Sequence, residues 1–128
     1  MAIRKRTLVQ KGEETKVEVD AAGRTLGRVA SDAASYLLGK RSVKFVKNEI
    51  TPIRVTIVNA RKIVISEKKM KEKEYARYSG YPGGLKFSTM AEVISKKGLN
   101  EIINRTVDGM LPRNKLRRER MKRLTITD

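Results

Sequence analysis

The sequence predicts an α/β fold with a mostly parallel central sheet, and three segments carry that prediction. Residues 17–20 alternate apolar and acidic side chains, as a half-buried strand does, and residues 54–60 are β-branched on both faces. Between them, residues 26–38 repeat apolar side chains at three- and four-residue spacing, which indicates an amphipathic helix. A strand, a helix and a strand in this order form a unit whose two strands are parallel.

The expected helix has clear ends and an apolar stripe made mostly of alanine. Thr25 can serve as its N-cap, and Gly39 ends it. Because alanine side chains are small, the stripe predicts close packing of the helix against the sheet. A further β-branched run, residues 63–66, follows the central strand and predicts another strand.

The middle of the chain is expected to alternate polar loops with a helix. Residues 67–77 mix both charges with hardly any apolar stripe, so we expect either a solvated excursion or a loop that RNA orders. Residues 78–86 are expected to form a loop whose three glycines let a partner approach the backbone. Thr89 and Glu92 then form a capping box, which begins a helix that ends near Gly98.

The C-terminal part is expected to hold a second helix and a basic segment. The helix runs from about Asn100 to Gly109, because Pro112 blocks its continuation. Residues 113–123 contain seven cations and one acid, with too few apolar side chains to bury a helix face. This segment therefore needs a partner, and residues 124–128 could form a final short strand.

The composition is that of one folded domain. The chain has 128 residues, of which 39% are hydrophobic, and it contains no internal repeat and no long linker. We expect a basic N-terminal arm over residues 1–15, an α/β core over residues 16–111 and a basic C-terminal extension over residues 112–128.

The absent residue types exclude most chemistries. The chain has no cysteine and no histidine, which removes disulfides, thiolate chemistry, the usual zinc sites and imidazole bases. We therefore expect no enzyme activity, no metal, no cofactor and no small-molecule substrate. Nothing resembles a signal peptide, and no run approaches about 18 apolar residues, so we expect a soluble, cytoplasmic protein without a membrane partner.

The charge points to a polyanion as partner. Thirty Lys and Arg against 14 Asp and Glu give a net charge of +16. The cations cluster at residues 4–6, 40–47, 61–73 and 113–123, and Phe45 lies among cations in the second cluster. No helix-turn-helix, zinc or RNP pattern is visible, which favours recognition of the shape and phosphates of a large folded RNA.

Two other functions remain open on the residues alone. One is a free RNA- or DNA-binding regulator, which would select a short oligonucleotide. The other is a nucleotide-dependent enzyme that would use the turn at residues 23–27, which lies between a strand and a helix. That turn lacks both the G-x-G-x-x-G and the Walker spacing, and its simplest interpretation is a tight turn.

Four strings, in order, resemble the large-subunit ribosomal protein family numbered thirteen. They are VDAAGRTLGRVA at residues 19–30, NARKIVI at 59–65, YSGYPGGLK at 78–86 and VDGMLPR at 107–113. The similarity spans about residues 16–124. It implies a three-layer α/β/α sandwich and a role in translation as a structural constituent that supports assembly of the large subunit. The implied partners are large-subunit ribosomal RNA and neighbouring ribosomal proteins.

The resemblance also implies which residues contact ribosomal RNA. For Arg24 and Arg28 the alternative is a surface salt bridge with Asp32. Where the family often has histidines near the glycine loop, this chain has Arg77 and Tyr81, which could replace their contacts. The candidate RNA-binding residues are Arg24, Arg28, Lys40, Arg41, Lys44, Gly83, Gly84, Lys86, Arg113, Lys115, Arg117, Arg118 and Arg120.

Two of these expectations concern stability. Arg117, Arg118 and Arg120 are expected to lie outside the core, so that their replacement by alanine would weaken RNA binding and leave the fold intact. Ala30→Glu is expected to unfold the domain, because it forces a charge into the alanine stripe.

Overall fold

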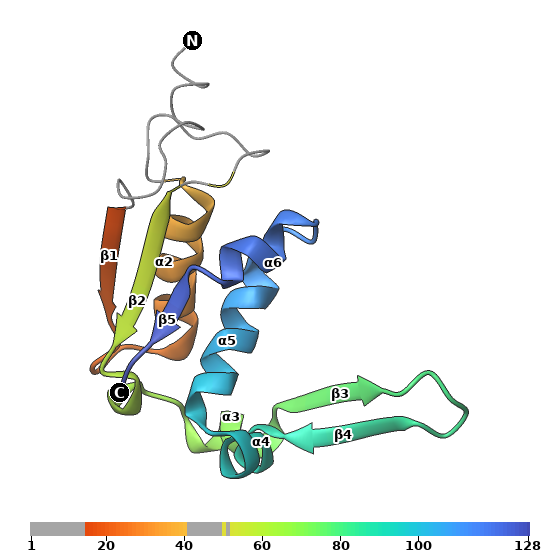
Figure 1. Ribbon diagram of the computed structural model, residues 1–128. Helices are drawn as coiled ribbons and strands as arrows, with labels where there is room; N and C mark the ends of the chain where they lie inside the picture. The colour runs from red at the N-terminus through yellow and green to blue at the C-terminus, as the bar shows by residue number, and fades with distance from the viewer. Residues whose placement is uncertain (1–14, 41–49, 51) are drawn as a thin grey trace.

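A parallel sheet of three strands forms the centre of the protein. The computed structural model describes residues 15–40, 50 and 52–128. Strand β2 (Ile53–Val58) lies between β1 (Thr15–Asp20) and β5 (Leu124–Ile126), and both neighbours run parallel to it (Figure 1). The predicted α/β class and the predominantly parallel sheet are therefore confirmed.

Helix α2 (Leu26–Leu38) connects β1 to β2 and carries the alanine stripe into the core. Ala30 and Ala33 are fully buried, and these small side chains let α2 pack closely against the sheet and against helix α5 (Leu99–Met110). Gly39 ends the helix in the left-handed conformation with φ 79°, a region that glycine adopts without strain. Thr25 occupies the N-cap position but makes no side-chain capping hydrogen bond.

The two faces of the sheet differ in polarity. Val19, Val55 and Ile57 point to one face and are buried in the core with α2 and α5. The opposite face carries the exposed residues Glu18 and Arg54. In the part of the chain that the structure describes, the helical layer thus covers one face, whereas a three-layer sandwich would cover both.

The segment after β2 does not form the further strand predicted at residues 63–66. The turn of 3-10 helix η1 (Ala60–Lys62) comes first, and then a single parallel bridge joins Val64 to Thr25. Ile63 and Ile65 pack against the core, while Val64 is half exposed. The place beside β2 is taken by β5, so this run only anchors the chain and pairs with no strand over its length.

Residues 67–77, predicted to be either a solvated excursion or a loop that RNA orders, are mostly exposed but form a helix and a strand and not a loop. Helix α3 (Glu67–Glu72) begins at Ser66, whose hydroxyl accepts a hydrogen bond from the backbone N–H of Lys69. Strand β3 (Glu74–Tyr78) follows and pairs antiparallel with β4 (Leu85–Thr89). The β3–β4 hairpin projects from the body of the molecule (Figure 1). The mixed charges of this segment do not indicate that β3 pairs with β4.

The two helices after the hairpin agree with the prediction. Helix α4 (Met90–Lys97) begins with the capping box of Thr89 and Glu92, in which each side chain binds the other residue's backbone N–H. Helix α5 follows directly and packs along α2.

The C-terminal segment belongs to the core rather than to a separate extension. Helix α6 (Leu116–Met121) packs near the end of α5, and β5 then completes the sheet. The basic segment predicted over residues 112–128 thus also contributes to the fold. Arg120 is 0% exposed, and the partly buried Met121 packs against the core. Little in the sequence indicates this packing, because the methylene groups of Arg120 add to the apolar surface that Leu116 and Met121 bury.

Candidate nucleic-acid interface

The β3–β4 hairpin has two chemically different faces. Arg77 lies directly opposite Lys86 in the strand register, so both cations share one face. Tyr78, Leu85 and Phe87 lie on the other face, where they are 65%, 53% and 58% exposed. The hairpin thus presents charge on one side and apolar surface on the other.

The tip of the hairpin needs its glycines for steric reasons. Gly83 has φ 76°, and a Cβ atom on Gly84 would overlap the Ser79 Oγ atom. A depression of about 440 Å³ lies beside this turn. The predicted RNA-binding residues Gly83, Gly84 and Lys86 lie together here. Arg77, which was predicted to replace a histidine contact of the family, lines the same depression. The lining residues are Arg77, Ser79, Pro82, Gly83, Gly84 and Lys86.

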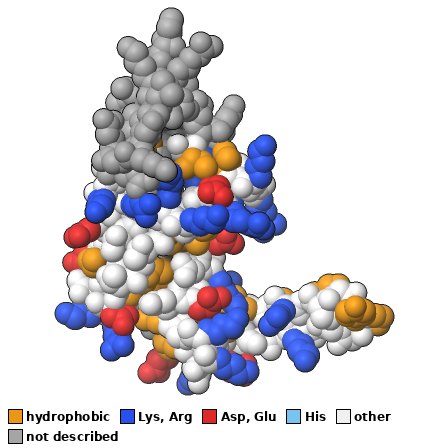
Figure 2. Space-filling view, viewed as in Figure 1, with side chains coloured by type: hydrophobic (Ala, Val, Ile, Leu, Met, Phe, Trp, Pro, Cys, Tyr) orange, Lys and Arg blue, Asp and Glu red, His pale blue; other side chains and the backbone are white. Residues whose placement is uncertain are grey.

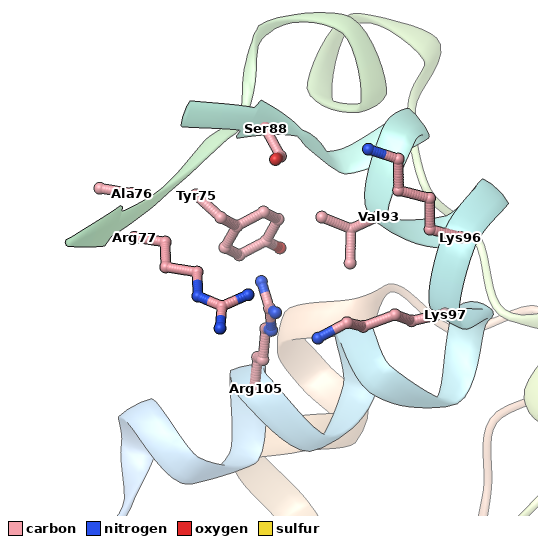
Figure 3. A pocket seen from close by; sticks show the side chains of 8 residues that line it. All are labelled: Tyr75, Ala76, Arg77, Ser88, Val93, Lys96, Lys97 and Arg105. Carbon is pink, nitrogen blue, oxygen red and sulfur yellow. The ribbon is translucent and has the colours of Figure 1, made fainter. Parts of the chain in front are cut away.

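A second cavity, the hairpin cleft, lies where the hairpin joins α4 and α5. It has a volume of about 270 Å³. Figure 3 shows the Tyr75 ring inside it, with the side chains of Arg77 and Lys97 reaching towards Arg105. Val93, which is almost fully buried, supplies apolar surface on the helix side. The lining residues are Tyr75, Ala76, Arg77, Ser88, Val93, Lys96, Lys97 and Arg105.

Arg105 is held in place from two sides in this cleft. Its Nε atom donates a hydrogen bond of 3.0 Å to the Glu101 carboxylate one turn earlier in α5. Its Cζ atom lies 5.2 Å from the centre of the Tyr75 ring, within the range of a cation–π contact. Burial raises the pKa of Tyr75, and the positive charge of Arg105 opposes part of that rise.

Lys96, Lys97 and Arg105 were not among the residues predicted to bind RNA. The two lysines end α4 and the arginine lies in the middle of α5, so on the sequence alone they are ordinary solvated helix residues. They lie beside Arg77 only because the hairpin packs next to α4 and α5, and this tertiary contact leaves no pattern in the sequence.

The C-terminal cations take three different positions. Arg113, Lys115 and Arg118 are exposed, and for Arg118 this confirms the expected position outside the core. Arg117 is about one-third exposed, and its Nε atom lies 3.3 Å from the Asp108 Oδ1 atom. Arg120 is buried, and this desolvation lowers the pKa of its guanidinium. The prediction that Arg120 lies outside the core is therefore wrong, and its side chain does not reach a surface where RNA could bind.

The candidate residues around α2 are also divided. Arg24, in the turn before the helix, forms the ion pair with Asp32 that was the alternative to RNA contact. Arg28 and Lys40 are exposed. The candidates Arg41 and Lys44 lie outside the described residues.

Three successive backbone N–H groups at the start of the glycine turn before α2 are bound within the protein. The backbone N–H of Gly23 donates to Lys62 O at 3.0 Å, and that of Arg24 donates to Ala21 O at 3.2 Å. The N–H of Ala22 donates to the Asp20 carboxylate at 2.9 Å. A phosphate-binding turn instead points its N–H groups at the ligand, so this geometry argues against nucleotide binding here.

The Asp20 carboxylate links this turn to the end of β2. It accepts hydrogen bonds from the Asn59 side chain at 3.0 Å and from the backbone of Ala22. These two bonds favour the ionised form, and they lower the pKa of Asp20 below its ordinary value.

The cationic residues cover separate parts of the surface. The hairpin and α6 lie near opposite ends of α5 (Figure 1), and Figure 2 shows Lys and Arg side chains at both places. Among the described residues, no group of three or more acidic side chains could hold a metal ion, and no helix is long and apolar enough to span a bilayer. The surface therefore suits a partner that extends over several faces.

Comparison with known proteins agrees with this surface. The family model described as ribosomal protein L13 matches residues 14–127. The large ribosomal subunit proteins uL13 of Trichlorobacter lovleyi and Clostridioides difficile are each 44% identical over 108 residues, covering 84% of this chain and 75% of the relative. That of Citrifermentans bemidjiense is 40% identical over 124 residues, covering 94% of this chain and 87% of the relative. The chain therefore belongs to the ribosomal protein L13 family.

Proposed function

We propose that the protein is a structural, non-enzymatic constituent of the large ribosomal subunit, which binds ribosomal RNA and supports assembly of the subunit. The observation that carries this proposal is the placement of exposed cations on separate parts of one packed body. They lie at the hairpin, at the hairpin cleft and in the segment around α6. The names of the relatives, which are large ribosomal subunit proteins, support the same conclusion.

The mechanism is electrostatic. Each Lys or Arg that contacts a phosphate releases condensed counterions, which makes binding favourable and dependent on salt. Such contacts position the protein without reading base sequence. Because the cations are fixed to a rigid core, they hold RNA segments at set distances from one another. We infer that the described residues act as one domain, since β5 from the C-terminal end completes the sheet that β1 begins.

Neighbouring ribosomal proteins are the second class of partner in this proposal. The apolar hairpin face of Tyr78, Leu85 and Phe87 supports it, because large apolar side chains gathered on one exposed face mark an interaction surface. Burial of this face in an assembly would also fix the direction in which the hairpin points.

The two alternatives receive less support. The N–H groups of Ala22, Gly23 and Arg24 are bound within the protein, which argues against a nucleotide-dependent enzyme. A free regulator would place its base-reading side chains on one element. Here the exposed cations are spread over several elements, as contacts with a large folded RNA require.

The test is binding to RNA transcripts over a range of salt concentrations. The full chain and either large-subunit or small-subunit ribosomal RNA are mixed with excess transfer RNA as competitor. We expect tighter binding to the large-subunit transcript, with an affinity that falls linearly in a plot of log affinity against log salt. Equal affinity for both transcripts would overturn the proposal.

A further inference from the structure

The hairpin cleft concentrates positive charge that the described part of the protein does not neutralise. Arg77, Lys96, Lys97 and Arg105 line it. Glu101 is paired with Arg105, but it binds the Nε side of that guanidinium and is not among the lining residues. Arg77, Lys96 and Lys97 form no ion pair with a described residue. Their mutual repulsion would be relieved by a bound anion.

Arg105 is oriented as a ready-made anion donor. The Glu101 carboxylate occupies Nε, and the Tyr75 ring lies against the guanidinium. The two Nη groups carry the donors that remain for a ligand, and a guanidinium edge matches two oxygens of a phosphate. Because the side chain is fixed before the ligand arrives, little conformational entropy is lost on binding.

The lining of the cleft favours a phosphate group over a whole nucleotide. The volume of about 270 Å³ lies at the lower end of the range for sites that hold drug-sized molecules. The one aromatic ring in the lining, Tyr75, already contacts Arg105 and Lys73, so it is not free to stack on a base. The cationic side chains therefore suit one or two phosphates better than a base, a sugar and a phosphate together.

The cationic surface continues from the cleft along the hairpin. Arg77 lines both the cleft and the depression at the tip, and Lys86 lies opposite it on the neighbouring strand. The row of Arg77 and Lys86 lies beyond the cations of α4 and α5, so the positive charge extends from the cleft onto the hairpin and is not confined to one point. Linked phosphates can contact both parts of this surface, whereas a single free anion would use only one.

We propose that the hairpin cleft binds a phosphodiester group of a single RNA strand, with Arg105 as the two-pronged donor and Lys96 and Lys97 as point charges. The adjacent phosphates of that strand lie along Arg77 and Lys86. The proposal rests on the proposed function, since it names the part of the surface where one RNA strand is held.

The test compares two pairs of exposed cations. Lys96→Ala/Lys97→Ala removes the last-turn lysines of α4. Lys16→Ala/Arg54→Ala removes two cations that lie opposite each other on β1 and β2, outside the cationic clusters. Each phosphate contact contributes about 0.7–0.9 to the slope of log affinity against log salt, so the α4 pair should reduce the slope by about 1.5. The β1–β2 pair should leave it nearly unchanged. Binding is measured with the large-subunit transcript and transfer RNA competitor.

Arg105→Lys separates geometry from charge. The variant keeps the charge but loses the forked donor, so the salt slope should stay the same while the affinity falls about tenfold, the loss expected for one charge-assisted hydrogen bond. Thermal unfolding of the variant shows whether the fold is intact. An unchanged affinity in a folded Arg105→Lys protein would overturn the assignment of Arg105.

The remaining outcomes distinguish the strand from a free anion and from failure of the proposed function. Inorganic phosphate is titrated while the Arg105 Nε–H resonance is followed by NMR. A shift with phosphate, together with unchanged RNA affinity in Lys86→Ala, would mean a site for a free anion and would overturn the strand. Equal salt slopes for the α4 double variant and the β1–β2 double variant would overturn the cleft but leave the proposed function standing. Equal binding of both transcripts by the unaltered chain would overturn the proposed function itself.

Discussion

The Nε atom of Arg117 lies 3.3 Å from the Asp108 Oδ1 atom, which ties α6 to the last turn of α5. Arg118, the next residue, is exposed, and Arg120 is fully buried. Three arginines within one short helix therefore have three roles: a partly exposed ion pair, a free surface charge and a core side chain. Experiments that replace all three together would mix these roles.

Separate substitutions should divide RNA binding from stability. Arg118→Ala should weaken RNA binding and leave the free energy of unfolding within about 0.5 kcal/mol of its original value, because the side chain is exposed. Arg120→Ala should lower that free energy by about 2–4 kcal/mol, because it empties the volume of a large buried side chain. Urea unfolding and filter binding measure the two effects. A stable Arg120→Ala protein would show that its burial does not matter for the fold.

Gly84→Ala should disrupt the hairpin tip and spare the core. The added Cβ atom would overlap the Ser79 Oγ atom and lie 3.0 Å from the Tyr81 carbonyl oxygen. Ser79 must therefore turn away and lose the hydrogen bond that its hydroxyl accepts from the Tyr81 N–H. Amide exchange should accelerate in β3 and β4 and remain slow in α2. Gly27→Ala is the control, because nothing lies within 4 Å of its added Cβ atom, and it should stabilise the helix by about 0.5–1 kcal/mol.

The stability of the fold should decrease in acid partly through Asp20. Its pKa is lower in the folded protein than the ordinary 3.8, because it accepts hydrogen bonds from Asn59 and Ala22. The ionised Asp20 carboxylate thus stabilises the fold at pH values above its ordinary pKa of 3.8. This contribution is lost as the pH falls through the lowered pKa of the folded protein. Asp20→Asn should lower the melting temperature at pH 7, and the difference from the original chain should shrink below pH 3.8. A difference that is constant with pH would contradict this assignment.

Ala30→Glu should unfold the protein. Ala30 is 0% exposed and lies on the face of α2 that packs into the core, so the variant buries an unpaired charge. Arg28→Glu places the same side chain on the exposed side of the same helix, and it should fold normally. Circular dichroism distinguishes the two. A folded Ala30→Glu protein would mean that α2 can shift away from the sheet.

Local sequence signals predicted the elements whose structure depends on nearby residues. The alanine stripe, Gly39 and the Thr89–Glu92 capping box define helix bounds through contacts within four residues, and the structure confirms them. The run at residues 63–66 has the composition of a strand but no strand beside it, because β5 arrives from the far end of the chain. Pairing partners so distant in sequence leave no local pattern.

The candidate interface also combines features that the sequence predicts with features that depend on tertiary packing. Exposed cations such as Arg28, Lys86 and Arg118 follow from composition and motif position. The burial of Arg120 depends on where α6 packs, and the assembly of the hairpin cleft depends on how the hairpin meets α4 and α5. Both are tertiary contacts, so neither could be derived from charge counts.

The most direct test of the central claim is the sedimentation of the protein in native lysates. Lysate is fractionated on sucrose gradients at high and at low magnesium, and the chain is followed by mass spectrometry. A constituent of the large subunit should sediment with whole ribosomes at high magnesium and remain with the large subunit when low magnesium separates the two. A position at the top of the gradient under both conditions would contradict the account.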